Sequence, residues 1–489
     1  MPYGWMLEYS SRGSMISPSM DRIPTGPLER DGARFMQLLE AVRDAAIEDG
    51  HWKLVSISLG SERLIDPLAV LESIYETGDR HCYIEQPEGG EALAGAEAII
   101  ERTFTGAARF EEARDFAREL FEHSVAVGQL DLPMSGPKLF CAFTFEDSSA
   151  PEAPFAPATL FVPRWQVSAR DGAYVATANL LVTPDGDLEE QARRALDAHR
   201  KFSTFAYARS RGPDAGATGE LREENAAWYR GGVEKALGEI RAARCSKIVI
   251  ARSEKFVSKQ PLHPLATLAR LRNIYPSCHC FSFAGTDGLS FIGSTPERLA
   301  RVENGMLDTE AIAGTAPRGA NSAEDAGLAA DLMGCDKQMR EHMAVAETIA
   351  AQLAGLGLDF GPMQRPRLLR LANAQHIRTP FRAAVPEGMH IFDIAAALHP
   401  TPATAGLPRE SALDSLREIE GSPRGLYAGL TGWTGADGEG ELVVALRSGF
   451  VRGHEAILFA GAGIVDGSDP VDEENETRLK MSALAKSLG

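Results

Sequence analysis

Gly461–Lys480, with the sequence GAGIVDGSDPVDEENETRLK, joins a predicted buried strand at Ala456–Ala460 to a predicted helix. The glycine-rich start, Gly461-Ala462-Gly463, predicts a turn in which a backbone without Cβ lies close to a ligand. Asp469 and Pro470 favour a helix start, because aspartate is a good N-cap and proline suits the first helical position. The stretch therefore predicts a strand, a turn and a helix in succession.

One face of that helix carries charge. Glu473, Glu476 and Lys480 fall at i, i+3 and i+7, so their side chains share a face. Two carboxylates and an ammonium beside a glycine turn predict a site for a metal ion and an anionic ligand. The alternative is a solvated helix surface with a Glu476–Lys480 pair at i, i+4.

The composition narrows the class of protein. The chain has 489 residues and a formal net charge of −18, which argues against nucleic acid or anionic membranes as partners. Its six cysteines show no CxxC pair or disulfide-type spacing, and no hydrophobic run approaches membrane length. We therefore expect a cytoplasmic protein with reduced thiols, whose site for any small anion needs local cations.

The order of predicted elements favours an α+β fold with antiparallel sheets, because strands come in runs between helices without regular βαβ alternation. Gly212–Gly219 predicts a linker between residues 1–219 and 220–489. Asn304-Gly305 predicts a type I′ hairpin turn. The predicted helices are Ala33–Glu48, Asp66–Glu76, Phe110–Glu122, Leu188–Tyr207, Glu220–Ala243, Pro264–Ile274 and Asp336–Leu356.

Two residues upstream have the character of an acid–base pair. Lys247 opens the strand KIVIAR and shares a face with Val249 and Ala251, and poor solvation there favours a neutral amine that acts as a base. Glu297 follows a glycine–proline turn, which aims its carboxyl group inward, where burial keeps it protonated. The alternatives are a lysine reaching water at a strand end and a surface pair between Glu297 and its neighbouring arginine.

Further candidates lie between these residues and the final helix. Glu341 lies on the long predicted helix, and together with Glu476 it would suit Mg²⁺, which prefers oxygen ligands. His342 beside it is either a metal ligand or an ordinary core histidine. Two arginines on strand-like segments indicate carboxylate recognition, because the guanidinium fork matches a carboxylate. They are Arg378 in AQHIRTP and Arg447 in VVALRSGF, and His376 lies in the same stretch as Arg378.

From about residue 220 to the end, the chain resembles the chorismate-utilising enzymes. The stretches that carry the resemblance, in order, are KIVIAR, FIGSTPERL, TEAIAGTAPRG, MREHMAVAE, QHIRTPF, LHPTPATAG, GLYAGLTGW, ALRSGF and GAGIVDGSDPVDEENETRLK. The first half resembles the family mainly at DPLAVLES and HCYIEQP. The resemblance implies one large α/β sandwich of two packed antiparallel sheets with helices outside. Residues 1–219 would form the N-terminal half of the sandwich, and residues 220–489 the chorismate-binding catalytic region.

The resemblance also implies a reaction. Members that add water to chorismate carry a lysine at the position of Lys247, and isochorismate synthases are similar to this chain at Ala403. The chain shows no glutaminase segment, so no glutaminase subunit is expected. The implied function is Mg²⁺-dependent, reversible conversion of chorismate to isochorismate for menaquinone or siderophore biosynthesis. The alternatives are a salicylate synthase, which also eliminates pyruvate, and a non-catalytic chorismate-binding protein.

The resemblance assigns roles residue by residue. Lys247 would be the general base and Glu297 the general acid, while Glu341 and Glu476 would hold Mg²⁺. The residues that would line the substrate site are Gly314, His376, Ala403, Arg447, Gly461 and Lys480. One departure lies in DEENET, where many relatives have a tryptophan at the position of Glu474.

Overall fold

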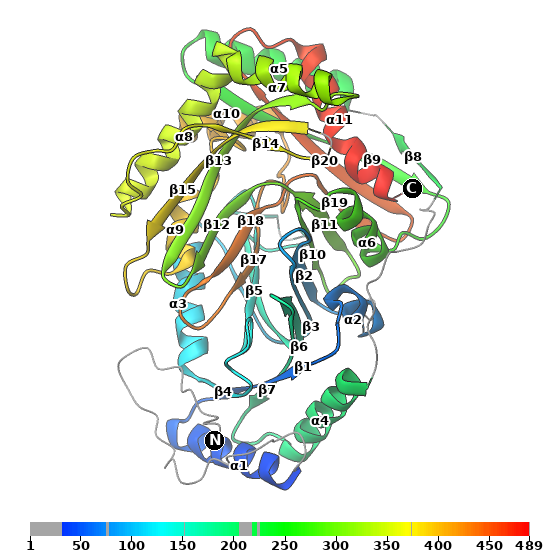
Figure 1. Cartoon of the computed structure of the whole chain (residues 1–489), viewed down its shortest axis with the longest axis vertical. Helices are drawn as coiled ribbons and strands as arrows, with labels where there is room; N and C mark the ends of the chain where they lie inside the picture. Colours follow the sequence, from blue (N-terminus) through cyan, green and yellow to red (C-terminus); the bar gives the residue numbers. More distant parts are fainter. Residues whose placement is uncertain are drawn as a thin grey trace.

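The computed structural model describes residues 32–488 except 75–77, 151, 205–217, 223–224 and 373. Its strands are linked into one hydrogen-bonded sheet that divides at the long strand β6 (Ala158–Arg170). One edge of β6 pairs along its length with β3, while the other edge pairs first with β5 and then with β7. The two main arms of the sheet therefore start from the same strand (Figure 1).

The first arm runs from β6 toward the last strand of the chain. Its strands, in order of pairing, are β3 (Glu91–Phe104), β2 (His81–Gln86), β10 (His279–Ala284), β11 (Ser290–Thr295), β19 (Ser448–Arg452), β20 (Glu455–Ile464) and β9 (Lys247–Ser258). The short strands β8 (Gly219–Arg222) and β16 (Gly406–Leu407) complete the far edge of β9.

The second arm runs from β6 toward the middle of the chain. Its strands, in order of pairing, are β5 (Leu139–Phe143), β17 (Leu430–Thr434), β18 (Gly440–Val444), β12 (Arg298–Glu303), β13 (Met306–Pro317), β15 (Ala374–Ala384) and β14 (Arg367–Arg370). A third branch extends from β7 (Ala173–Val182) through β1 (Lys53–Ser61) to β4 (Ser124–Gly128), which is parallel to β1.

The two arms pack face to face, and helices cover their outer faces. One buried aromatic cluster joins the arms. It contains Phe140 of β5 and Phe161 of β6 together with Phe281, Phe283 and Phe291 of the first arm. The helices on the first arm are α2 (Pro67–Ile74), α6 (Pro264–Ile274), α11 (Pro470–Leu488), α5 (Ala226–Arg241) and α10 (Arg409–Glu420). Those on the second are α3 (Arg109–Glu122), α7 (Ser322–Gly334), α8 (Asp336–Gly355) and α9 (Ile391–Leu398).

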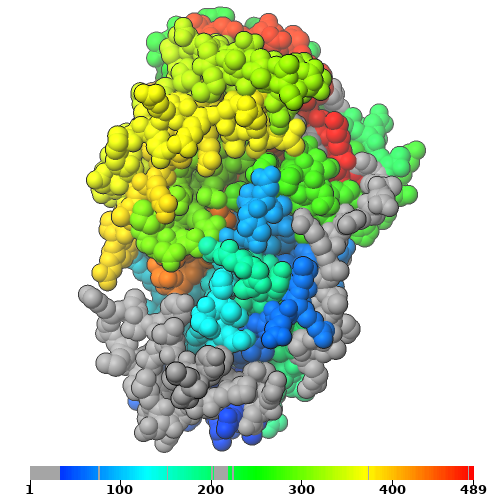
Figure 2. All heavy atoms as spheres, in the orientation of Figure 1, coloured from blue at the N-terminus to red at the C-terminus, as the bar shows by residue number. Residues whose placement is uncertain are grey.

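Helices α1 (Gly32–Asp49) and α4 (Leu188–Thr204) cover the third branch. The predicted α+β sandwich of two packed antiparallel sheets with outer helices is confirmed. None of the described helices is long and apolar enough to cross a membrane. Figure 2 shows the surface of the molecule in the orientation of Figure 1. The β2–β3 hairpin, in lighter blue, reaches upward there among segments of the second half of the chain.

The prediction of a glycine turn at Gly461–Gly463 is wrong. Strand β20 continues through these residues, which pair with Ala251–Val249 of β9. The physical reason is space for a neighbouring side chain, since a Cβ on Gly463 would lie 2.8 Å from Cε of Lys247. The glycines thus allow a close approach within a strand, where the backbone needs no turn.

Other boundaries also differ from the predictions. Helix α5 begins at Ala226, because the strand β8 precedes it, and β9 extends six residues beyond the predicted end at Arg252. The predictions missed β3, β4 and α7. The hairpin turn is confirmed, since Asn304 and Gly305 have φ of 51° and 67°. Most of the predicted linker, residues 212–217, lies outside the described residues.

Candidate active site

Six elements bring the candidate residues together. Strands β9 and β20 supply Lys247 and Gly461, while β13 and β15 of the second arm supply Gly314 and His376. Helices α8 and α11 carry Glu341 and the charged face of the last helix, and α8 packs on β13 while α11 packs on β20. The site therefore lies between the free ends of the two arms, where residues from both arms and from two covering helices converge (Figure 1).

Lys247 is buried, with 6% of the residue exposed. Its Nζ donates a hydrogen bond of 2.6 Å to Oε1 of Glu341 on α8, so the first and second arms are joined by an ion pair. A Cβ on Gly463 would lie 3.3 Å from this Nζ and 3.5 Å from the Glu341 oxygen. The missing side chain of Gly463 therefore makes room for the ion pair beside the strand.

Glu297 lies between β11 and β12 and is also buried, with 6% exposed. Burial is the largest cause that raises the pKa of its carboxyl group to about 7, and the charge of Glu310 adds to the rise. The hydroxyl of Thr401 donates to Glu297 Oε1 at 3.3 Å and acts in the opposite direction, as does the charge of Lys247. Near neutral pH this carboxyl group is therefore protonated in a large share of molecules.

The charged face of α11 has the predicted arrangement. Nζ of Lys480 contacts Oε1 of Glu476 at 2.7 Å and donates to the carbonyl oxygen of Gly461 at 2.9 Å. The charge of Lys480 is the main cause that lowers the pKa of Glu476, and Lys247 also contributes. Burial raises the pKa of Glu473, with a further rise from the charge of Glu476. Lys480 therefore links the helix directly to the glycines of β20.

A guanidinium and an imidazole form the next part of the site. Nη2 of Arg447 lies 3.2 Å from Nε2 of His376, and the other ring nitrogen of His376 lies 3.1 Å from the hydroxyl of Thr315 and 3.2 Å from the carbonyl oxygen of Gly314. Burial and the charge of Arg447 lower the pKa of His376 to about 3, so the ring is neutral. Arg447 has a φ of 47°, and Gly314, at a bulge in β13, has a φ of 77°.

The remaining candidates divide into two groups. Ala403 lies in the loop after α9, two residues from Thr401, which holds the Glu297 carboxyl group. His342 is fully buried and contacts the hydroxyl of Thr379 at 2.8 Å, so it is a core histidine. Arg378 pairs with Glu310 and is 42% exposed, so its guanidinium is occupied by that carboxylate.

Sequence reasoning missed two contributors. Thr401 gave a usable signal, because it stands in the same HPTPA stretch as Ala403. Tyr427 lies in GLYAGLTGW, which also carries the resemblance, but nothing in that stretch predicts that its hydroxyl would lie 3.2 Å from a Cβ placed on Gly461. The phenol stacks on Phe459 and is buried, which raises its pKa above the usual range. Both residues enter the site from loops whose position depends on the whole fold.

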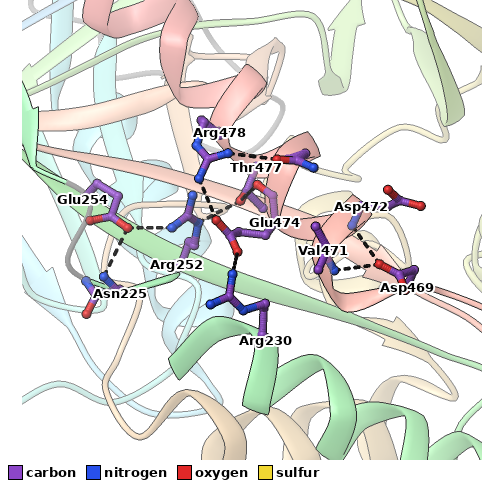
Figure 3. Close-up of polar contacts among 11 residues, drawn as sticks. Asn225, Arg230, Arg252, Glu254, Asp469, Val471, Asp472, Glu474, Thr477 and Arg478 are labelled. Carbon is purple, nitrogen blue, oxygen red and sulfur yellow. Dashed lines mark hydrogen bonds and ion pairs between the residues drawn. The ribbon is translucent and has the colours of Figure 1, made fainter. Parts of the chain in front are cut away.

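The opposite face of α11 is fixed by a buried polar network (Figure 3). Arg252 of β9 donates to the hydroxyl of Thr477 at 2.7 Å and to Glu254 at 2.6 Å. Glu474 accepts from Arg230 of α5 and from Arg478, each at 2.7 Å. Glu474 is thus a buried anion between two guanidinium groups, and the helix is held against β9 and α5.

The beginning of α11 is also as predicted. The carboxyl group of Asp469 accepts hydrogen bonds from the backbone nitrogens of Val471 at 2.8 Å and Asp472 at 3.2 Å (Figure 3). Pro470 is the first helical residue. The cap satisfies two of the four backbone donors that a helix start leaves without partners. The first turn, which carries Glu473, is therefore fixed next to the site.

The predicted metal ligands fit a magnesium ion in their chemistry. Glu341 and Glu476 offer carboxylate oxygens from two helices. The amine of Lys247 hydrogen-bonds to Glu341, and its charge contributes to the lowered pKa of Glu476. Among the described residues, no group of three or more histidine, cysteine, aspartate or glutamate side chains is placed to hold a metal ion. Two glutamates are nevertheless a usual protein contribution to a Mg²⁺ site, because this ion commonly completes its shell with water and substrate oxygens.

Comparisons with known proteins identify the family of the chain. The family described as chorismate binding enzyme matches residues 39–489. The salicylate biosynthesis isochorismate synthase of Pseudomonas aeruginosa is 33% identical over 433 residues, which cover 87% of this chain and 88% of that protein. The isochorismate synthase MenF of Bacillus subtilis is 29% identical over 464 residues, covering 93% of this chain and 97% of that protein.

A solved structure extends the likeness to three dimensions. The menaquinone-specific isochorismate synthase MenF of Escherichia coli superposes with a TM-score of 0.73 at 26% identity, covering 92% of this chain and all of that one. Sequence, fold and site geometry lead to one conclusion, which is that the chain belongs to the chorismate-binding enzyme family.

Proposed function

We propose that the chain is an isochorismate synthase, which adds water at C2 of chorismate and releases the C4 hydroxyl group as water. The observation that carries the proposal is the buried Glu297, whose pKa of about 7 keeps an acid available near neutral pH, in the same site as a buried lysine. Acid–base chemistry near neutral pH requires one group that donates and another that accepts a proton. The names of its relatives fit this activity.

Lys247 is the general base in this proposal. Its amine, which is paired with Glu341 in the structure, must first lose a proton, and it then takes a proton from the water molecule whose oxygen attacks C2. Its position is set by Glu341 at 2.6 Å and by the space beside Gly463, so that the nitrogen is held at a fixed point of the site. A base must lie within hydrogen-bond reach of the proton it removes, and a buried, anchored amine meets this requirement better than a mobile surface lysine.

Glu297 is the general acid. Its carboxyl proton passes to the C4 hydroxyl oxygen as the C4–O bond breaks, and the double bonds of the ring shift toward the leaving group. Burial favours the neutral acid, which is the form that donates. The reverse reaction uses the same two groups with exchanged roles, so the conversion is reversible and needs no redox cofactor.

The remaining charges are proposed to bind the substrate. Arg447 and Lys480 supply positive charge for carboxylates of chorismate, and His376, Gly314, Gly461 and Ala403 line the space around them. Glu341 and Glu476 would hold Mg²⁺, which would supply positive charge to the ring carboxylate of the substrate. These cations allow an anionic substrate to approach a chain with a formal charge of −18.

The cellular setting is proposed from the relatives. One solved relative is specific for menaquinone and another relative is specific for vibriobactin. We therefore propose that the isochorismate made here is used for menaquinone or for a siderophore, in the cytoplasm. The reaction adds water and needs no ammonia, so the chain is proposed to work without a glutaminase subunit.

The test is direct. The purified chain is incubated with chorismate and Mg²⁺, and the products are separated by chromatography. Isochorismate without pyruvate is the expected result. Stoichiometric salicylate and pyruvate would instead show a salicylate synthase, anthranilate formed with added ammonia would show an amine-transferring enzyme, and binding of chorismate without any product would show a non-catalytic protein.

A further inference from the structure

We propose that Thr401 is a positioning residue for the general acid. Its hydroxyl group holds Oε1 of Glu297, so that the proton destined for the substrate is carried on Oε2, and it stabilises the carboxylate that remains after the proton has left. This inference rests on the proposed function, because it assigns a task within that reaction. In this proposal Thr401 acts only through Glu297 and does not contact the reacting atoms of the substrate.

The geometry around the carboxyl group supports this role. Thr401 is 5% exposed and Glu297 is 6% exposed, so bulk water does not supply a substitute for the contact. Among the described residues, the hydroxyl of Thr401 is the group that hydrogen-bonds to the Glu297 carboxyl, at 3.3 Å from Oε1. The second oxygen, Oε2, therefore remains for the substrate.

The loop that carries Thr401 is rigidly hydrogen-bonded. The carbonyl oxygen of Thr401 accepts from the backbone nitrogens of Thr404 at 3.0 Å and Ala405 at 2.9 Å, and from the hydroxyl of Thr404 at 3.1 Å. The carbonyl oxygen of Thr404 in turn accepts from the buried Arg424 at 2.8 Å. The position of the Thr401 hydroxyl is thus set by the backbone, independently of Glu297.

The hydroxyl proton of Thr401 has two possible acceptors. Oγ1 of Thr404 and Oε1 of Glu297 each lie 3.3 Å from the Thr401 oxygen. The Thr404 hydroxyl donates to the Thr401 carbonyl group at 3.1 Å, and in that arrangement the Thr404 oxygen accepts from Thr401. A carboxylate is a stronger acceptor than a hydroxyl oxygen, so ionisation of Glu297 draws the Thr401 proton toward Oε1.

The proton transfer then balances as follows. The O–H bond at Oε2 breaks and a new O–H bond forms on the C4 hydroxyl oxygen, which leaves as water with the electron pair of the C4–O bond. The negative charge stays on the carboxyl group of Glu297, where Thr401 donates a hydrogen bond to it. Lys247 has taken one proton from the attacking water, so the proton count of the site is conserved.

The test compares variants that remove or keep the hydroxyl group. Thr401→Val has nearly the same shape without a donor, Thr401→Ala removes the hydroxyl without a new methyl group, and Thr401→Ser keeps it. We expect kcat to fall about tenfold or more in the valine and alanine variants, since a hydrogen bond to a charged group is lost. The KM for chorismate should change by less than about threefold, because Thr401 does not bind the substrate.

The pH profile provides the readout that a purely structural role would not move. Because Thr401 stabilises the ionised form of Glu297, its loss should shift the alkaline limb of kcat to higher pH, and Thr401→Ser should restore the limb and the rate. Thr348→Val is the matched control, since the hydroxyl of Thr348 donates to the carbonyl oxygen of Ala344 within α8 at 2.7 Å, and its alkaline limb should match the wild type.

Two results would overturn the inference. One is a wild-type kcat and an unchanged alkaline limb in Thr401→Val or Thr401→Ala. The other is a serine variant as impaired as the valine variant, which would show that packing of the loop matters and the hydroxyl does not. If either variant without the hydroxyl fails to fold, the other and the serine variant still decide. A wild-type protein that makes no isochorismate would instead overturn the proposed function.

Discussion

Glu297 shows how burial of one residue sets the pH range of an enzyme. Its pKa of about 7 means that the donating form is present below pH 7 and is lost above it. We therefore expect kcat to decline as the pH rises through about 7, and Glu297→Gln to lower kcat by roughly 10²–10⁴ because an amide cannot donate the carboxyl proton. Steady-state kinetics across pH 5–9 measure both, with Glu418→Gln on the exposed side of α10 as the control. A glutamine variant with wild-type kcat would move the acid to another residue.

Lys247 separates addition of water from mere binding of chorismate. We expect Lys247→Gln to lose isochorismate formation by about 10²-fold or more while it still binds chorismate, since an amide is not a useful base. Lys255→Gln is the matched control, because Lys255 lies on the same strand, is 40% exposed and pairs with Glu455. Product chromatography and a fluorescence binding titration give the two readouts. Normal turnover in Lys247→Gln would reject the proposed first step.

Glu341 and Glu476 are expected to bind Mg²⁺ together. Glu341→Gln or Glu476→Gln should weaken Mg²⁺ binding about tenfold or more, and chelation should abolish turnover until Mg²⁺ is restored. Calorimetric titration of Mg²⁺ in the presence of chorismate measures the binding without relying on activity. Glu347→Gln, on the exposed side of α8, should bind Mg²⁺ like the wild type. Full activity of either glutamine variant in EDTA would refute the metal assignment.

At the scale of elements, helix α11 has two polar faces with different tasks. One face carries Glu476 and Lys480 to the site, and the other is fixed to β9 through Thr477 and Arg252. Thr477→Val leaves a buried guanidinium nitrogen without its partner, so we expect the free energy of unfolding to fall by about 1–3 kcal/mol. Chemical denaturation measures the change. Ser482→Ala is the control, because Ser482 is half-buried on the same helix and its hydroxyl bonds only to the carbonyl oxygen of Leu479; equal stability of the two variants would contradict the prediction.

The elements also show what the sequence can predict. The start of α11 and the Asn304-Gly305 hairpin were predictable because a cap and a turn depend on a few neighbouring residues. The path of β20 through Gly463 was not, because this glycine is explained by the side chain of Lys247 on a different strand. Strand β3 was missed for a similar reason, since its small residues in EALAGAEA acquire their strand character by pairing with β2 and β6.

In the candidate site, too, some features could be predicted from the sequence and others depend on contacts between distant residues. The resemblance assigned Lys247, Glu297, Glu341 and Glu476 residue by residue, and the structure brings their elements together. The contact between Thr401 and Glu297 spans 104 residues of sequence, so no local pattern could predict it. The proposed acid–base and metal-binding residues could therefore be named from the sequence. A residue whose task is to hold another side chain in place is recognised only from the folded structure.

At the scale of the whole molecule, buried neutral histidines make the fold sensitive to acid. Burial lowers the pKa of each imidazole from its ordinary value of 6.5 to about 4 or about 3; the residues are His81, His199, His376, His390 and His399. Because the folded pKa lies below the unfolded value, the unfolded chain binds more protons once the pH falls below 6.5.

Stability should therefore be full above about pH 6.5 and fall progressively between pH 6.5 and about 4. Each unit of pKa difference corresponds to about 1.4 kcal/mol, so several such groups are significant against a typical stability of about 5–15 kcal/mol. Carboxylates with a lowered pKa, such as Glu441 at about 2, add to the loss only below about pH 4.5. Urea midpoints measured from pH 8 to pH 5 test this, and a midpoint that does not decline would contradict it.

The branching of the sheet at β6 has a consequence for how the chain is made on the ribosome. Strand β2 finds its outer neighbour in β10, and β5 finds its outer neighbour in β17, about 200 and 290 residues later in the sequence. While the first half emerges, both strands expose an edge that has no partner yet, and such edges attract other nascent chains. A newly synthesised first half therefore depends on rapid elongation or on a chaperone, and a messenger that stalls near its middle should yield aggregates instead of a half-sized folded unit.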